Sequence, residues 1–136
     1  MSRILIAGCG DVGTALGLAL AEHGHEVFGA RRSAHRLPEP LRPLPVDLTD
    51  ARAIERAIPT VDAAVYAVAA GSRDEGAYRR AYVDGVSALL EVLEARAESP
   101  RRVFFVSSTS VYGERGGEWI DETAPLAPRG FAGESL

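Results

Sequence analysis

The sequence contains no lysine, because all 15 of its basic residues are arginine. Any mechanism that requires a lysine from this chain is therefore excluded. Cysteine is nearly absent as well: the single residue, Cys9, cannot form an intramolecular disulfide, which is typical of a reducing compartment. Cys9 lies within a glycine-rich turn, and this position indicates a need for a small side chain rather than a redox role.

An excess of positive charge and long apolar runs are also missing. The net charge of −4 and the lack of an arginine-dense stripe argue against a nucleic-acid partner. No apolar run is long enough to span a bilayer, and the amino terminus has no leader cleavage site, so we expect a cytoplasmic protein without a membrane partner. A length of 136 residues with 46% hydrophobic and 25% charged residues predicts one soluble globular domain over residues 1–136.

Metal ligands and paired carboxylates do not occur in useful patterns. His23, His25 and His35 lack the spacing of a zinc site, and no second cysteine supports them. Asp121 and Glu122 are adjacent and therefore diverge on any regular element, which argues against a catalytic carboxylate pair. We expect no metal site.

What is present is a glycine motif close to the amino terminus. An apolar run over residues 4–7 leads directly into G-x-G-x-x-G at Gly8, Gly10 and Gly13, and an alanine- and leucine-rich stretch without proline follows. Strand, glycine turn and helix in this order are the context in which the motif indicates dinucleotide binding, although an ordinary glycine-rich βα turn remains the alternative. Gly8 then permits the tight turn, Gly10 lets the backbone approach a pyrophosphate, and Gly13 allows close helix packing.

The remaining sequence alternates between strand-like and helix-like segments. This alternation predicts an α/β fold with a doubly wound parallel sheet, the Rossmann fold, in the strand order 3-2-1-4-5. A dinucleotide is then expected above the carboxyl ends of the first and fourth strands. The expected strands are residues 3–7, 25–31, 44–46, 61–68 and 102–107, the expected helices are 11–23, 51–58 and 74–98, and residues 33–45 form a proline-rich surface connection.

The end of the second strand favours NADP over NAD. NAD-binding versions of this fold carry an acidic residue about 20 positions after the glycines, to accept a hydrogen bond from the ribose 2′-hydroxyl. Here Arg31, Arg32 and Ser33 occupy that region, and no acidic residue lies between Glu26 and Glu39. A guanidinium group suits a 2′-phosphate, although an exposed arginine pair at a strand end is the alternative interpretation.

Residues at the other strand ends complete the predicted cofactor site. Asp47 and Leu48 follow the third strand near the expected adenine, and Asp47 has an equally good alternative role as a helix cap. The candidate cofactor-binding residues are Gly8, Gly10, Asp11, Val12, Gly13, Arg31, Arg32, Ser33, Asp47, Leu48, Ala67, Val68, Ala69 and Ser107.

Five segments together resemble the NAD-dependent epimerase/dehydratase type of the short-chain dehydrogenase/reductase superfamily. They are residues 4–13, 65–70, 82–91, 106–113 and 120–125, in the family's order. The resemblance implies an oxidoreductase that transfers hydride to or from a nicotinamide, with a small-molecule substrate such as a sugar nucleotide. It also implies that Ser108 is catalytic and hydrogen-bonds the reacting oxygen; a serine at a strand end can instead satisfy local backbone groups.

The sequence departs from this family at the positions of the acid/base pair. The resemblance assigns the family's tyrosine to Ala132 and its lysine to Leu136, and neither side chain can exchange the required proton. Ala7 stands where the family usually has its first glycine, and Tyr82 where it has asparagine. These departures indicate an atypical member, and they leave a non-catalytic dinucleotide-binding or redox-sensing module, or an inactive fragment of a longer enzyme, as alternatives.

The resemblance also implies further strands and a substrate lobe beyond residue 136. We therefore expect an incomplete Rossmann domain whose last strand exposes Val103 and Phe105 at an unpaired edge. That edge, or the helix over residues 74–98, is a candidate contact for a homo-oligomer. Val86, Leu89, Leu90 and Leu93 are the expected buried stripe of this helix, with Arg79, Arg80, Glu94 and Arg96 solvated. Trp119 is expected to pack its loop back on the core or to cover a ligand.

Overall fold

A single parallel sheet organises the chain, as the alternating sequence predicts. The computed structural model describes residues 1–113 and 116–136. The five strands are ordered β3-β2-β1-β4-β5, and every neighbouring pair is parallel, which confirms the predicted doubly wound order. Their bounds are β1 (Arg3–Ala7), β2 (Glu26–Arg31), β3 (Arg42–Pro45), β4 (Ala63–Tyr66) and β5 (Arg102–Phe105).

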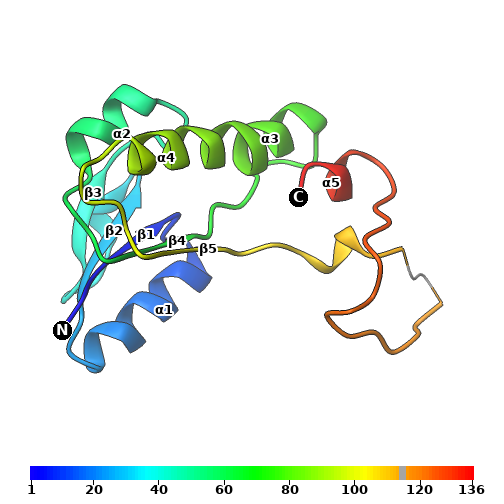
Figure 1. Ribbon diagram of the computed structural model, residues 1–136, viewed down its shortest axis with the longest axis horizontal. Coiled ribbons are helices and arrows are strands. Elements are labelled where there is room, and N and C mark those ends of the chain that lie inside the picture. The colour runs from blue at the N-terminus through cyan, green and yellow to red at the C-terminus, as the bar shows by residue number, and fades with distance from the viewer. Residues whose placement is uncertain (114–115) are drawn as a thin grey trace.

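Helices cover the two faces of this sheet unequally (Figure 1). One face carries α1 (Asp11–Glu22), and the opposite face carries α2 (Ala51–Ala57), α3 (Glu75–Arg79) and α4 (Gly85–Glu94). None of the helices in the described ranges combines the length and the apolar character needed to cross a membrane. The layered arrangement explains why β1 and β4 are almost continuously apolar, since both of their faces are covered.

The apolar core lies on both sides of the sheet. The larger cluster includes Leu5, Ile54, Tyr66 and Leu89 and fills the space between the sheet and the helices α2 and α4. The smaller cluster consists of Ile6, Cys9, Val27 and Leu41, with α1 residues packed against it. Alternate residues of β1 therefore point into different clusters, as the pleat of a strand requires.

The long helix expected over residues 74–98 is interrupted and shorter. A π-helical turn, Arg80–Asp84, separates α3 from α4, and α4 ends at Glu94. Leu89 and Leu93 are buried as predicted and Val92 joins them, whereas Val86 and Leu90 are only partly buried. The added residue in the π turn shifts the buried stripe, which a regular 3.6-residue period does not anticipate.

Arg96 is not the solvated residue that the sequence pattern suggests. Its guanidinium group donates to the carbonyl oxygens of Glu55, Ile58 and Pro59 at 3.1, 2.7 and 2.9 Å. These carbonyls lie at the carboxyl end of α2, where the last helical acceptors have no amide partner. Arg96 thus fastens the chain after α4 to the end of α2.

The segment after β5 extends away from the sheet (Figure 1). It contains a 3-10 turn, Thr109–Val111, and a short helix, α5 (Phe131–Glu134), which the sequence analysis did not predict. Val103 and Phe105 are 41% and 38% exposed, in agreement with the expected open edge, while association through this edge or through α4 stays a prediction. The expectation that Trp119 packs on the core is wrong: its side chain is fully exposed, because no sheet lies beneath this segment.

We expect Arg96→Met to lower the free energy of unfolding by about 1–2 kcal/mol, because three carbonyls at the end of α2 lose a charged donor while the aliphatic stem is kept. Chemical denaturation measures this change. Arg52→Met, on the exposed side of α2, is the matched control and should change stability by less than about 0.5 kcal/mol. Equal losses in the two variants would show that the bonds of Arg96 contribute nothing specific.

Candidate functional site

A crevice of about 750 Å³ opens where β1, β2, β3 and β4 end. It lies at the carboxyl edge of the sheet, where the strand order reverses between β1 and β4, the usual ligand position in this type of fold. Twelve of the predicted cofactor residues line it: Gly8, Gly10, Asp11, Val12, Arg31, Arg32, Ser33, Asp47, Leu48, Ala67, Val68 and Ala69. Segments far apart in the sequence therefore converge on one concave surface.

The glycine turn has the conformation that its sequence predicts. Gly8 has φ +95°, and a Cβ at this position would overlap the backbone of Val68, two residues after β4. The Gly8 amide donates to Ala30 O at 2.9 Å, which ties the turn to β2. Gly13 does not line the crevice. It packs against the glycine turn, where a Cβ would overlap Gly8 O and crowd Ile6. Both positions therefore require glycine for close packing.

Gly10 differs from the other two glycines because it faces open space. Apart from its two chain neighbours, no protein atom among the described residues lies within 4 Å of an ideal Cβ at Gly10, and its φ of −81° is open to any residue. Gly10 is also the N-cap of the 12-residue helix α1 and provides no side-chain cap, so the first amides of α1 are available to an external acceptor. An anion in this space would meet backbone N–H groups and the positive end of the helix dipole.

Arg31 connects the end of β2 to the glycine turn. Its Nη1 donates to Cys9 O at 2.8 Å, and its side chain also lines the crevice. Cys9 itself is fully buried, and burial raises the pKa of its thiol to about 11, with a smaller opposing effect from the charge of Arg31. The thiol is therefore protonated at neutral pH, in agreement with a packing role for Cys9.

The structure tests one of the two roles considered for Asp47. The cap of α2 is Asp50, whose carboxylate accepts from Arg52 N and Ala53 N, so the capping interpretation of Asp47 is wrong. Asp47 instead accepts from the amide of Thr49 at 2.9 Å and from its hydroxyl at 2.7 Å. The hydrogen bond from the Thr49 amide is the main cause that lowers the pKa of Asp47, and the nearby positive charge of Arg32 lowers this pKa further.

Tyr66 is a residue of the crevice that the sequence analysis missed. It is only 2% exposed and ends β4, and its ring stacks on Phe105 with centroids 5.9 Å apart. Its hydroxyl donates to Ala81 O in the π turn. Burial raises the pKa of this hydroxyl, so it remains a donor at neutral pH. An aromatic residue in an apolar strand gives no sequence signal for such a bond.

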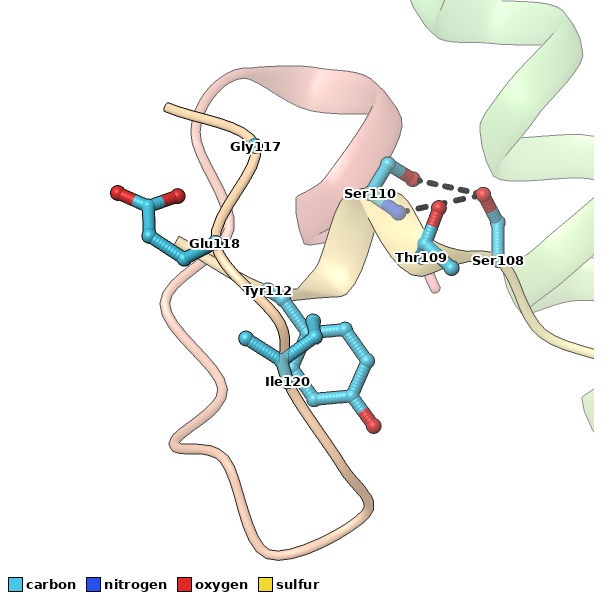
Figure 2. Close-up of a pocket in the computed structure, with 7 residues that line it drawn as sticks. All are labelled: Ser108, Thr109, Ser110, Tyr112, Gly117, Glu118 and Ile120. Atoms are coloured by element: carbon cyan, nitrogen blue, oxygen red, sulfur yellow. Dashed lines mark hydrogen bonds between the residues drawn. The ribbon is translucent and has the colours of Figure 1, made fainter. Parts of the chain in front are cut away.

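Ser108 belongs to a second, smaller cavity of about 410 Å³ beyond β5 (Figure 2). Its hydroxyl accepts from Ser110 N at 3.3 Å and from Ser110 Oγ at 3.2 Å, so the local bonding considered for this serine is present. The structure does not bring Ser107 or Ser108 onto the wall of the crevice that holds the glycine turn. The residues around the smaller cavity are Ser108, Thr109, Ser110, Tyr112, Gly117, Glu118 and Ile120.

Helix α5 lies against the turn that carries these serines. A Cβ at Gly133 would overlap Ser110 O, so the two segments are in direct backbone contact. Ala132 and Leu136, the positions that the resemblance assigns to tyrosine and lysine, flank this contact in sequence. Helix α5 therefore packs on the serine-bearing turn, but neither Ala132 nor Leu136 has a side-chain proton to exchange. Within the described ranges, no cluster of three potential metal ligands occurs.

The model of the NAD dependent epimerase/dehydratase family matches residues 4–131, which is nearly the whole chain. The chain belongs to this family. The match includes the glycine turn, all five strands and the serine-bearing turn, in agreement with the resemblance of the sequence motifs. No curated protein matches the chain significantly.

Solved structures of this family superimpose closely. A candidate NAD-dependent epimerase/dehydratase from Methylobacillus flagellatus is 39% identical, with a TM-score of 0.80 over 98% of this chain and 47% of its own. A short-chain dehydrogenase/reductase superfamily protein from Agrobacterium tumefaciens, solved with bound NAD, is 30% identical. Its TM-score is 0.78, over 98% of this chain and 41% of its own. A UDP-galactose 4-epimerase is 25% identical, with a TM-score of 0.82 over 98% of this chain and 47% of its own. The chain thus spans about half the length of these proteins.

Proposed function

We propose that the chain binds a nicotinamide dinucleotide in the crevice, with the diphosphate against the glycine turn. The observation that carries this proposal is the open space beside Gly10 at the start of α1. A diphosphate there accepts hydrogen bonds from backbone amides without displacing any side chain. The structure of the relative from Agrobacterium tumefaciens with bound NAD supports the same class of ligand.

The proposed cofactor is NADP, with NAD as the weaker ligand. Arg31, Arg32 and Ser33 line the crevice at the end of β2, where an NAD-binding protein offers a carboxylate to the ribose. Arg31 uses Nη1 for Cys9 O, and the remaining N–H groups of its planar guanidinium can face a 2′-phosphate. Asp47 and Leu48 then lie beside the adenine, and Ala67, Val68 and Ala69 form the opposite wall. Gly13 supports the turn from below.

The proposed reaction is hydride transfer between NADP and a small-molecule substrate, with a sugar nucleotide as the candidate suggested by the similarity to UDP-galactose 4-epimerase. The bound nicotinamide supplies the hydride acceptor or donor. In this proposal the hydroxyl of Ser108 hydrogen-bonds the reacting oxygen, and Ser107 contacts the cofactor. The hydroxyl-rich cavity around Ser108 and Ser110 supports this assignment.

A second candidate is a dinucleotide-binding module without catalysis, and the side chains of Ala132 and Leu136 favour it. Turnover distinguishes the two candidates. For the enzyme, we expect NADPH oxidation with a member of a panel of carbonyl compounds and sugar nucleotides, and its loss in Ser108→Ala but not in Ser87→Ala, an exposed serine on α4. Tight NADPH binding without any turnover would instead establish the module.

Titration calorimetry with the two cofactors tests the choice of NADP. We expect NADPH to bind about tenfold more tightly than NADH, because a 2′-phosphate gains charge-assisted hydrogen bonds with the arginines. Arg32→Ala should bring the two affinities close together. Arg36→Ala, an exposed arginine outside the crevice, is the matched control and should preserve the difference. Equal or tighter binding of NADH by the unsubstituted chain would contradict the proposal.

Gly10→Val tests the position of the diphosphate. The variant should fold with an unchanged melting temperature, because its added atoms point into open space, and it should lose NADPH binding, because those atoms occupy the diphosphate position. Gly10→Ala should show an intermediate loss of affinity. Thermal unfolding and NADPH titration of the same samples separate the two effects. Unchanged affinity in Gly10→Val would place the diphosphate elsewhere.

A further inference from the structure

The π turn between α3 and α4 diverts one backbone amide from its usual α-helical acceptor. The amide of Gly85 donates to Arg80 O, five residues back, where an α-helix would have it donate to Ala81 O. Such single π turns insert one extra residue into a helix and occur frequently at functional sites. Ala81 O therefore needs a donor from outside the helix, because an unpaired buried carbonyl is costly.

That donor is the hydroxyl of Tyr66 at the end of β4. The hydroxyl reaches the helix backbone only because position 85 is glycine, since a Cβ there would overlap Tyr66 Oη. The Tyr66 hydroxyl, Gly85 and the π turn are thus three parts of one arrangement. Ala81 and Tyr66 are both buried, so water does not readily replace this bond.

The same turn forms a wall of the crevice. Arg80 and Ala81 line it from the π turn, and Ala77 lines it from α3. Tyr82, the next residue, accepts a hydrogen bond from Ala70 N at 3.5 Å and so contacts the loop that follows β4. In Figure 1, this loop is the segment of chain that runs from β4 to α3. If the π turn moved toward the amino end of the helix, the residues between its old and new positions would rotate by about 100° relative to α4, and Arg80 and Ala81 would leave the wall.

We propose that Tyr66 is a positioning residue for the cofactor: its hydroxyl keeps the helix in the π register, and that register forms the crevice wall at Arg80 and Ala81. This inference rests on the proposed function, because the wall is taken to contact the bound dinucleotide. Tyr66 acts through the helix backbone and is given no part in proton transfer. A purely structural tyrosine would stabilise the fold without setting the affinity for the cofactor.

A double-mutant cycle on the full 136-residue chain separates these roles. Tyr66→Phe leaves Ala81 O unpaired, and Gly85→Ala drives a methyl group into the hydroxyl, so each should lower the melting temperature by about 5 °C. Each should also weaken NADPH binding about tenfold. In the combined variant the methyl group fills the space of the hydroxyl, and the amide at position 85 can return to Ala81 O. The melting temperature should then recover, while the affinity stays about tenfold below that of the unsubstituted chain.

Tyr78→Phe is the matched control, because it removes the same atom from a tyrosine of α3 that does not line the crevice. It should leave the affinity for NADPH unchanged. Recovery of both stability and affinity in the combined variant would overturn the positioning role, and additive losses of melting temperature would overturn the link between Tyr66 and Gly85. Failure of the unsubstituted chain to bind either NADPH or NADH would instead overturn the proposed function, and the positioning role with it.

Discussion

The close approach of the Gly8 turn to two neighbouring strands is the constraint on which the rest of the structure depends. The Gly8 amide donates to Ala30 O in β2, and Gly8 lies against the backbone of Val68 after β4. The first turn of α1 packs on the same turn at Gly13. Side chains at these glycines would push the helix away from the sheet. Because they are absent, the amino end of α1 lies directly over the carboxyl edge of β1, and its amides border the crevice.

This constraint is local, which is why the sequence alone predicts so much of the fold. A strand, a glycine turn and a helix within residues 3–22 determine each other through backbone sterics, and the tight turn predicted at Gly8 and the close packing predicted at Gly13 are confirmed. Alternation of strands and helices, together with the right-handed crossover, then determines the strand order. The residues that line the crevice follow from the same rule, because parallel strands place their carboxyl ends at one edge.

The features that sequence analysis missed depend on contacts between distant segments. Arg96 lies in a polar stretch and resembles a solvated residue, yet it bonds three carbonyls at the end of α2. Tyr66 resembles an ordinary strand residue, yet its hydroxyl meets the π turn. Ser108 lies after β5, and the turn that carries it forms a separate cavity that the strand order alone does not predict; its catalytic role stays a prediction.

The hydrogen bond between Arg31 and Cys9 O has a thermodynamic consequence for recognition. One guanidinium group lines the crevice at the end of β2 and at the same time holds the backbone of the glycine turn through Cys9 O. Any ligand group that draws Arg31 toward itself also alters the energy of the glycine turn, so the two halves of the proposed dinucleotide would bind as coupled rather than independent units. For such a ligand, the binding energies of separate mononucleotide fragments would not sum to that of the intact molecule.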